Sequence, residues 1–194
     1  MANRAALRWE LAGVAVIFLT GSALHSAFDW TGHWRPIAWF APVNESVWEH
    51  FKLAFWPGVL YAMLEYLALR RSVNNFWVGK CLGLFSMPVA VAVLFYGYTA
   101  VLRHHHVALD ILIFLLAVGI GQWVSDRILA SADMGTTVCR GAMIGLVVMA
   151  AAFALFSYWP PRVFLFEDSR THQYGIPAEH QEHGPGMSMA ADTM

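Results

Sequence analysis

Histidine and acidic side chains recur at one-turn spacing beside the apolar runs of this chain. His25 and Asp29 are four residues apart, and so are Ser46 and His50. In a helix, residues with this spacing lie on one face, so each pair presents two polar groups together. Imidazole and carboxylate ligands from neighbouring helices can converge inside a bundle, and without thiolate they suit zinc, iron or manganese. The candidate metal ligands are His25, His50, His104 and Asp110.

The stretch PVNESVWEHFK, residues 42–52, places several polar side chains directly ahead of a long apolar run. In a catalytic interpretation, Glu45 or Glu49 is the general base for a metal-activated water, and Ser46 donates a hydrogen bond to a developing oxyanion. In a structural interpretation, Ser46 and Glu49 form a Ser-x-x-Glu capping box that begins a helix. Capping leaves Glu45 unexplained, because like charges one turn apart on a helix are unfavourable unless a cation, a proton or Lys52 intervenes. Both interpretations stay open.

Asp110 lies inside an apolar run, where an ionised carboxylate at the centre of a bilayer costs about 2.5–3.5 kcal/mol. It follows the RHHH segment of residues 103–106. Its expected partner is Arg103 or His106, or a cation that both share. The RHHH segment also suits an ordinary polar turn between two helices.

Glu65 is a second acidic residue inside an apolar run. It lies fifteen residues beyond His50, which is about 22 Å along a helix. We therefore expect it near the opposite end of the helix, paired with Arg70 or Arg71. A buried carboxylate there also suits a proton or cation pathway.

The composition indicates a membrane protein. Of 194 residues, 58% are hydrophobic and 13% are charged, whereas soluble domains average roughly 45–50% and about 25%. The formal net charge of −1 excludes a broad basic surface for nucleic acid. The two isolated cysteines form neither a disulfide framework nor a metal-binding CxxC pair.

Five apolar stretches of about 20 residues are long enough to cross a bilayer as helices. They are residues 7–28, 46–69, 76–102, 107–129 and 138–158. We therefore expect an all-α integral membrane bundle of five transmembrane helices over residues 1–176. The remaining residues, 177–194, lack periodicity, and we expect them to be a disordered tail.

Basic residues predict how the bundle is oriented. With a cytoplasmic N-terminus, seven of the 12 Lys and Arg residues lie on the cytoplasmic side, which agrees weakly with the positive-inside rule. Five alternating spans would then place all 9 histidines on the outer face. We expect an N-in, C-out topology in a bacterial inner membrane, with the His/Glu/Asp cluster at the outer mouth of the bundle.

Four segments resemble an uncharacterised family of small bacterial multi-span membrane proteins, classed as a domain of unknown function. They are NESVWEHFKLAFWP, YGYTAVLRHHHVALDILIF, GIGQWVS and PPRVFLFEDSRTHQYGI, and the likeness covers the chain to about residue 176. The family implies a compact integral membrane fold and an important NESVWEH segment, but no established reaction. Its members carry GHN where this chain has Arg103-His104-His105, which favours His104 as the histidine to follow.

A partial likeness links the chain to the superfamily of membrane hydrolases that includes alkaline ceramidases. There, a Ser-x-x-x-His on one span joins an Asp and further histidines around zinc, and Ser46-x-x-x-His50 matches that fragment. The superfamily differs in having seven spans and an H-x-x-x-H where this chain offers only His106-x-x-x-Asp110. The likeness therefore serves as an analogy for a reaction class.

The tail carries a second group of soft metal ligands. Imidazole and thioether groups favour copper, and the tail contains His180, His183, Met187, Met189 and Met194. An ordinary solvated tail explains the same composition.

Three functions agree with these patterns. The first is a metal-dependent hydrolase or transferase that acts on a lipid or lipid-linked group. The second is a transporter that uses the cluster as an entry site for a proton or divalent cation, with Glu65 on the route inward. The third is a non-catalytic binding or assembly subunit, in which paired histidines would also suit haem. The first is favoured, because water and lipid headgroups both reach the outer mouth.

Overall fold

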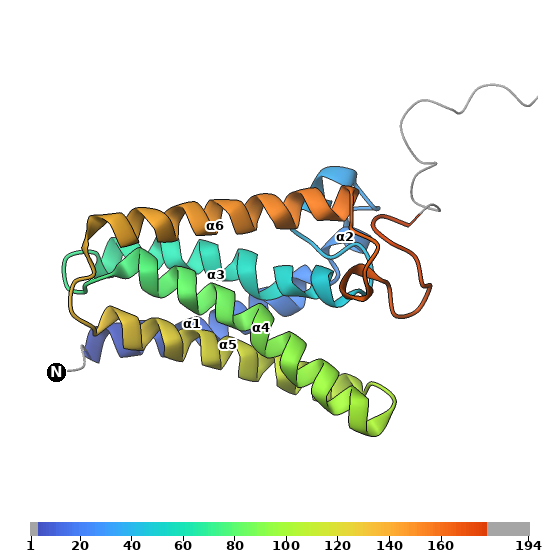
Figure 1. The fold of residues 1–194 in the computed structure, drawn as a ribbon, viewed down its shortest axis with the longest axis horizontal. Helices are drawn as coiled ribbons and strands as arrows, with labels where there is room; N and C mark the ends of the chain where they lie inside the picture. Colours follow the sequence, from blue (N-terminus) through green and yellow to red (C-terminus); the bar gives the residue numbers. More distant parts are fainter. Residues whose placement is uncertain (1–3, 178–194) are drawn as a thin grey trace, which may run out of the picture.

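The computed structural model describes residues 4–177, which form a bundle of long helices joined by short connections (Figure 1). The long helices are α1 (Arg4–Leu24), α3 (Val47–Leu69), α4 (Phe76–Leu102), α5 (Val107–Leu129) and α6 (Gly135–Tyr158). The short ones are α2 (Ala27–Trp30), η1 (Arg35–Trp39) and η2 (Phe164–Phe166). Among the described residues the only strand-like pairing is an isolated bridge between Glu167 and Tyr174. The all-α prediction is confirmed. Residues 178–194, which include the candidate copper ligands of the tail, lie outside the described residues.

The five long helices follow the apolar runs expected from the sequence. The bounds of α4 and α5 coincide with the expected ones, and α3 and α6 end where expected. The first helix ends at Leu24 rather than at residue 28, because the backbone turns at residues 25 and 26 before α2 begins. This turn removes His25 from the helix, so the expected one-turn pairing with Asp29 does not form.

Four of these helices, α1, α4, α5 and α6, are long and apolar enough to cross a membrane. The chain is therefore described as a multi-pass membrane protein. The fifth expected span, α3, has 23 residues but is not among the four. Its apolar run is interrupted by Glu49, Lys52 and Glu65, all of which are buried inside the bundle.

The helix α3 lies at the centre of the bundle, in contact with α1, α4 and α6. Its start is packed by aromatic rings, because the ring of Trp48 lies 4.9 Å from that of Phe153 on α6 and 4.6 Å from that of Phe166 in η2. Phe55 packs against Phe153 in the same core, with ring centroids 5.0 Å apart. The segment after α6 therefore folds back over the start of α3.

Successive long helices run in alternating directions (Figure 1). The α3–α4 and α5–α6 connections lie at the end of the bundle where α1 begins. The opposite end carries α2, η1, the start of α3, the α4–α5 loop and the segment after α6. At this end α4 and α5 diverge from α6. Because several connections lie at this end, residues that are far apart in the sequence lie around the start of α3.

Candidate metal centre

A cleft of about 500 Å³ opens between α1, α3, α4 and α5, at the end of the bundle that carries the start of α3 and the α4–α5 loop. Most of its wall is apolar, with Phe18, Leu53, Val91, Phe95 and Phe114 among the lining residues. Its polar lining residues include His25, Glu45, His50, His105, Asp110 and Arg170. Small-molecule sites commonly have this size and this combination of an apolar wall with few polar groups.

His25 and His50 meet at this cleft. The Nε2 atom of His25 lies 3.3 Å from Nε2 of His50. The close approach of α1 and α3 depends on Gly21, because a Cβ atom there would lie 2.3 Å from the backbone oxygen of Leu53. α1 can therefore bring His25 up to His50 only because residue 21 has no side chain.

Glu45 completes a group of three potential ligands. Its Oε2 atom lies 3.5 Å from Nε2 of His50, and the ligand atoms of His25, Glu45 and His50 all lie within 4.8 Å of one another. The three side chains come from the turn after α1, the loop before α3 and the first turn of α3. Two imidazoles and a carboxylate match the His₂Glu donor set of catalytic zinc sites.

The tautomer of His50 determines what this group can do. Its Nδ1 atom lies 2.8 Å from the backbone oxygen of Ser46, which can only accept a hydrogen bond. Nδ1 therefore carries the proton, and in the neutral ring Nε2 presents a lone pair to the carboxylate of Glu45. Two acceptors facing each other require a proton or a cation between them. A backbone carbonyl on the far nitrogen is also the usual way in which a ligating histidine is oriented.

The spacing of the two imidazoles suits a metal ion. Zinc–nitrogen bonds of about 2.0–2.1 Å at a tetrahedral angle hold two ligand atoms about 3.3–3.4 Å apart, which agrees with the 3.3 Å between the two Nε2 atoms. Partial burial of the ring, reinforced by the neighbouring His50, lowers the pKa of His25 from its ordinary value of 6.5. A lowered pKa favours the neutral imidazole that a metal requires.

The segment after α6 holds Glu45 in place. The carboxylate of Asp168 accepts a hydrogen bond of 3.0 Å from the backbone N–H of Glu45. Arg170 approaches the side chain of Glu45, with Nη2 3.6 Å from Oε1. Burial opposes ionisation of Asp168, but hydrogen bonds from the backbone N–H groups of Glu45, Thr171 and Arg170 outweigh it and lower the pKa of Asp168. The carboxylate of Asp168 therefore joins the segment after α6 to the loop before α3 that carries Glu45. We call this loop the ligand loop and this contact the Asp168 clamp.

Asp110 lines the cleft from the first turn of α5, but it is outside the group of three. Its Oδ2 atom lies 3.4 Å from Nδ1 of His105, and its Oδ1 atom accepts a hydrogen bond from the hydroxyl of Tyr98. The carboxylate of Asp110 therefore contacts His105 and Tyr98, rather than the expected side chains of Arg103 or His106. The ring of His104 packs edge-on against that of His106, with ring centroids 4.4 Å apart, and His104 is not among the residues that line the cleft.

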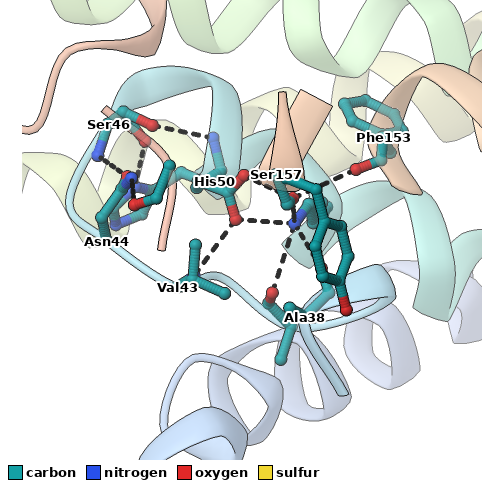
Figure 2. Close-up of polar contacts among 12 residues, drawn as sticks. Ala38, Val43, Asn44, Ser46, His50, Phe153 and Ser157 are labelled. Atoms are coloured by element: carbon teal, nitrogen blue, oxygen red, sulfur yellow. Dashed lines mark hydrogen bonds and ion pairs between the residues drawn. The ribbon is translucent and has the colours of Figure 1, made fainter. Parts of the chain in front are cut away.

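Glu49 lies in a separate, buried network rather than in the cleft. Its Oε2 atom is 2.6 Å from Nζ of Lys52, and Ser157 on α6 donates a hydrogen bond of 2.7 Å to its Oε1 atom. Lys52 also donates to the backbone oxygens of Ala38 and Ala41 at 2.8 and 3.3 Å, and to the hydroxyl of Ser157. Figure 2 shows the contacts with Ala38 and Ser157, and the hydrogen bond that the N–H of Val43 donates to Oε2 of Glu49. This network fixes the loop before α3 to α3 and α6, and leaves Glu49 no free oxygen for catalysis.

Ser46 caps α3, as the structural interpretation predicted. Its Oγ atom accepts a hydrogen bond of 3.3 Å from the N–H of Glu49. The reciprocal half of the capping box is absent, because the side chain of Asn44, not that of Glu49, accepts the hydrogen bond from the N–H of Ser46 at 2.9 Å. The residue Ser46 is buried, and its hydroxyl is engaged in the cap.

Two further expectations are corrected. Glu65 pairs with Lys80 on α4 rather than with Arg70 or Arg71. Asp29 pairs with His33, whose Nε2 atom lies 3.1 Å from its Oδ1 atom. The sequence interpretation missed Arg170 and Asp168, which set the environment of Glu45. It named Lys52 as a group that could intervene between Glu45 and Glu49, and Lys52 pairs with Glu49.

The comparison with known proteins places the chain in a family. It belongs to the family of unknown function DUF6512, whose model matches residues 1–176. The resemblance to an uncharacterised family is thus confirmed. No curated protein and no solved structure matches the chain.

Proposed function

We propose that this member of an uncharacterised family is a membrane-embedded, metal-dependent hydrolase or transferase for a lipid or lipid-linked substrate. His25, Glu45 and His50 are its metal ligands. The observation that carries the proposal is that the ligand atoms of these three residues lie within 4.8 Å of one another at a largely apolar cleft. In the ceramidase-type superfamily that this chain partly resembles, histidines and an acid hold zinc beside a lipid site, which supports the reaction class only by analogy.

The donor set supports zinc, with iron or manganese as the other candidates. Three protein ligands leave a coordination position open, as in catalytic rather than structural zinc sites. A divalent metal held there supplies a Lewis acid and lowers the pKa of a bound water. The residues of this chain would orient the ligands: the Ser46 carbonyl fixes His50, and Asp168 fixes the backbone of Glu45.

The substrate class follows from the cleft. Its apolar wall is formed by membrane helices and is suited to an acyl chain, while the ligands occupy the end that faces the loops. Arg170 lies beside Glu45 and is exposed, so it can bind an anionic or strongly polar headgroup. An amphiphile would therefore lie with its headgroup at the metal and its chain between α1, α4 and α5.

A proton acceptor is available in the same cleft. The carboxylate of Asp110 is paired with His105 and hydrogen-bonded to Tyr98. We assign this pair the transfer of protons to and from the reacting group, the role that the sequence interpretation gave to Glu45 or Glu49. Glu45 acts as a ligand instead, and Glu49 as the buried partner of Lys52.

The position in the membrane is part of the proposal. We place α3 as the fifth span, because its charged residues are shielded by the surrounding helices and its 23 residues match a bilayer in length. With the N-terminus inside, the cleft faces the outer leaflet of a bacterial inner membrane. The basic residues near α1 and after α3 agree with this orientation.

The test is metal-dependent turnover of lipid by the full-length protein in vesicles. His180→Ala and His183→Ala should be introduced first, so that the tail offers no imidazole. Products released from a mixed lipid extract are followed by mass spectrometry after chelation and after return of zinc, iron or manganese. We expect turnover that is lost on chelation, restored by one of the metals, and abolished by Glu45→Gln and His50→Ala.

His104→Ala is the matched control, since it removes a histidine from the same end of the bundle but outside the group of three. It should retain turnover. If the metal-loaded protein releases no product from any lipid, or if turnover is indifferent to chelation, the hydrolase assignment fails. Weak, exchangeable metal binding with metal flux into the vesicles would support the transporter alternative instead.

A further inference from the structure

A second polar cluster lies in the other half of the bundle, about 20 Å along α3 from Lys52 by the helix rise. It consists of Glu10 on α1, Glu65 on α3 and Lys80 on α4. Nζ of Lys80 lies 2.7 Å from Oε1 of Glu10 and is also paired with Oε2 of Glu65. All three side chains are at most 3% exposed, so the cluster is inside the protein rather than at a wet interface.

The charges of this cluster do not balance when both acids are ionised. One ammonium group faces two carboxylates, and Asp126 on α5 adds a further negative charge nearby. Ser125 and Gln122 on α5 donate to Oε1 and to the backbone oxygen of Glu10 at 2.7 and 3.2 Å, but they are uncharged. Tyr61 on α3 donates its hydroxyl to the backbone of Trp9 and supplies no charge either. Two like charges that share one buried site cannot both be ionised at low cost.

The oxygen atoms indicate where the missing positive charge belongs. Oε2 of Glu10 and Oε1 of Glu65 are buried and have no hydrogen-bond partner. Both carboxyl groups also face the same ammonium group, since Oε1 of Glu10 and Oε2 of Glu65 each pair with Nζ of Lys80. Ionised carboxylates are acceptors only, so the two acids can share a hydrogen bond only when one of them carries a proton.

We propose that Glu10 and Glu65 form a proton-binding site, in which the two carboxyl groups share one proton above the ammonium group of Lys80. The ligand is a proton rather than a metal cation for two reasons. Lys80 already occupies the cationic position between the acids and would repel a second full charge. The surroundings are also tightly packed, because a Cβ atom on Gly13 would lie 1.9 Å from Nε2 of Gln122.

This site is independent of the proposed metal centre. It lies near the end of the bundle where α1 begins and where the α3–α4 connection turns, while the cleft lies at the opposite end. Three helices supply its members, so a change in how α1, α3 and α4 pack would change the affinity for the proton. It gives the protein a means of binding or releasing a proton within its membrane-embedded part.

Infrared difference spectroscopy tests the proposal on the full-length protein in lipid nanodiscs. A protonated carboxyl group in an apolar site has a carbonyl band that is separate from the ionised form and shifts in D₂O. We expect such a band at pH 7 in the wild type, its loss in both Glu65→Gln and Glu10→Gln, and its retention in Asp133→Asn. The last variant removes an exposed acid between α5 and α6.

The outcomes are distinct even if a variant folds poorly. Absence of the band from the wild type overturns the proposal without any variant. Persistence of the band in both glutamine variants also overturns it, because the proton must then lie elsewhere. A band that appears only after sodium is removed would replace the proton with a metal cation. Thermal melting should be no lower in the glutamine variants, because each leaves one carboxylate paired with the ammonium group of Lys80, the charge balance that the shared proton gives the wild type.

Discussion

Glu45 and Glu49 are four residues apart, yet their carboxylates lie in different environments. Oε2 of Glu45 is 3.5 Å from Nε2 of His50 in the cleft, whereas Oε2 of Glu49 is 2.6 Å from Nζ of Lys52 in the core. The separation arises because α3 begins only at Val47, after the Ser46 cap, so Glu45 lies in the loop and is free to face His25. One acid is thus available to a ligand, and the other stabilises the scaffold.

Glu49→Gln should destabilise the protein strongly. It leaves the ammonium group of Lys52 buried without a counter-charge, and breaking a buried ion pair costs about 3–5 kcal/mol. Thermal or denaturant unfolding in detergent measures the effect. Glu45→Gln is the matched control and should cost less than about 1 kcal/mol, as for a partly exposed pair. Equal stability of the two variants would refute the different roles assigned to these acids.

Gly21→Ala should move His25 away from His50. The added Cβ atom would lie 2.3 Å from the backbone oxygen of Leu53, which cannot rotate away. α1 must then shift, at a cost of about 1–3 kcal/mol for an overpacked contact, and metal affinity should fall with it. Gly97→Ala is the control, since nothing lies within 4 Å of a Cβ at that position. Unchanged metal binding in Gly21→Ala would mean that the two histidines do not share an ion.

Much of the fold could be predicted from the sequence, because long apolar runs bounded by polar turns allow few alternatives to helices. The starts of α3 and α5 follow from Ser46 and the RHHH segment, and α4 starts where its apolar run begins, at residue 76. The pairings between helices could not be predicted in the same way. Whether His50 meets His25 or His104 depends on close approaches such as that at Gly21, which involve residues far apart in the sequence.

The buried ion pairs of Lys80 with Glu10 and Glu65 could not be predicted for the same reason. Local reasoning paired Glu65 with Arg70 or Arg71, which are close in sequence, but these residues lie beyond the end of α3. Lys80 reaches Glu65 from the first turns of α4 instead. A signal was present, since Glu10, Glu65 and Lys80 interrupt apolar runs at similar distances from the same end of the bundle.

Val91→Trp should block the cleft without removing the metal. Val91 lines the apolar wall, and a large ring there would fill the space assigned to an acyl chain. We expect binding of a fluorescent lipid analogue to weaken at least about tenfold, which is about 1.4 kcal/mol. Val93→Trp is the control, because Val93 is 66% exposed and does not line the cleft. Undiminished binding in Val91→Trp would exclude the cleft as the lipid site.

Acid should release the segment after α6 from the ligand loop. The pKa of Asp168 is lowered from its ordinary value of 3.8 in the folded protein. Its contribution to stability is therefore complete above that value and is lost as the pH falls through the lower, folded pKa. Hydrogen exchange at the amides of Glu45, Arg170 and Thr171 should rise in this acidic range.

Asp168→Asn should raise the same exchange already at neutral pH, since the charge that accepts these hydrogen bonds is gone. Glu167→Gln, which changes a partly exposed neighbouring acid and leaves Asp168 in place, serves for comparison. Slow exchange at these three amides in Asp168→Asn would contradict the clamp.

The most direct measurement is elemental analysis of the detergent-purified, full-length protein that carries His180→Ala and His183→Ala. We predict about one equivalent of zinc, iron or manganese per chain, lost in His25→Ala, Glu45→Gln and His50→Ala and retained in His104→Ala. Asp110→Asn should also retain it, because Asp110 lies outside the group of three. Absence of stoichiometric metal from the folded protein, or equal metal in all variants, would contradict a metal centre at His25, Glu45 and His50.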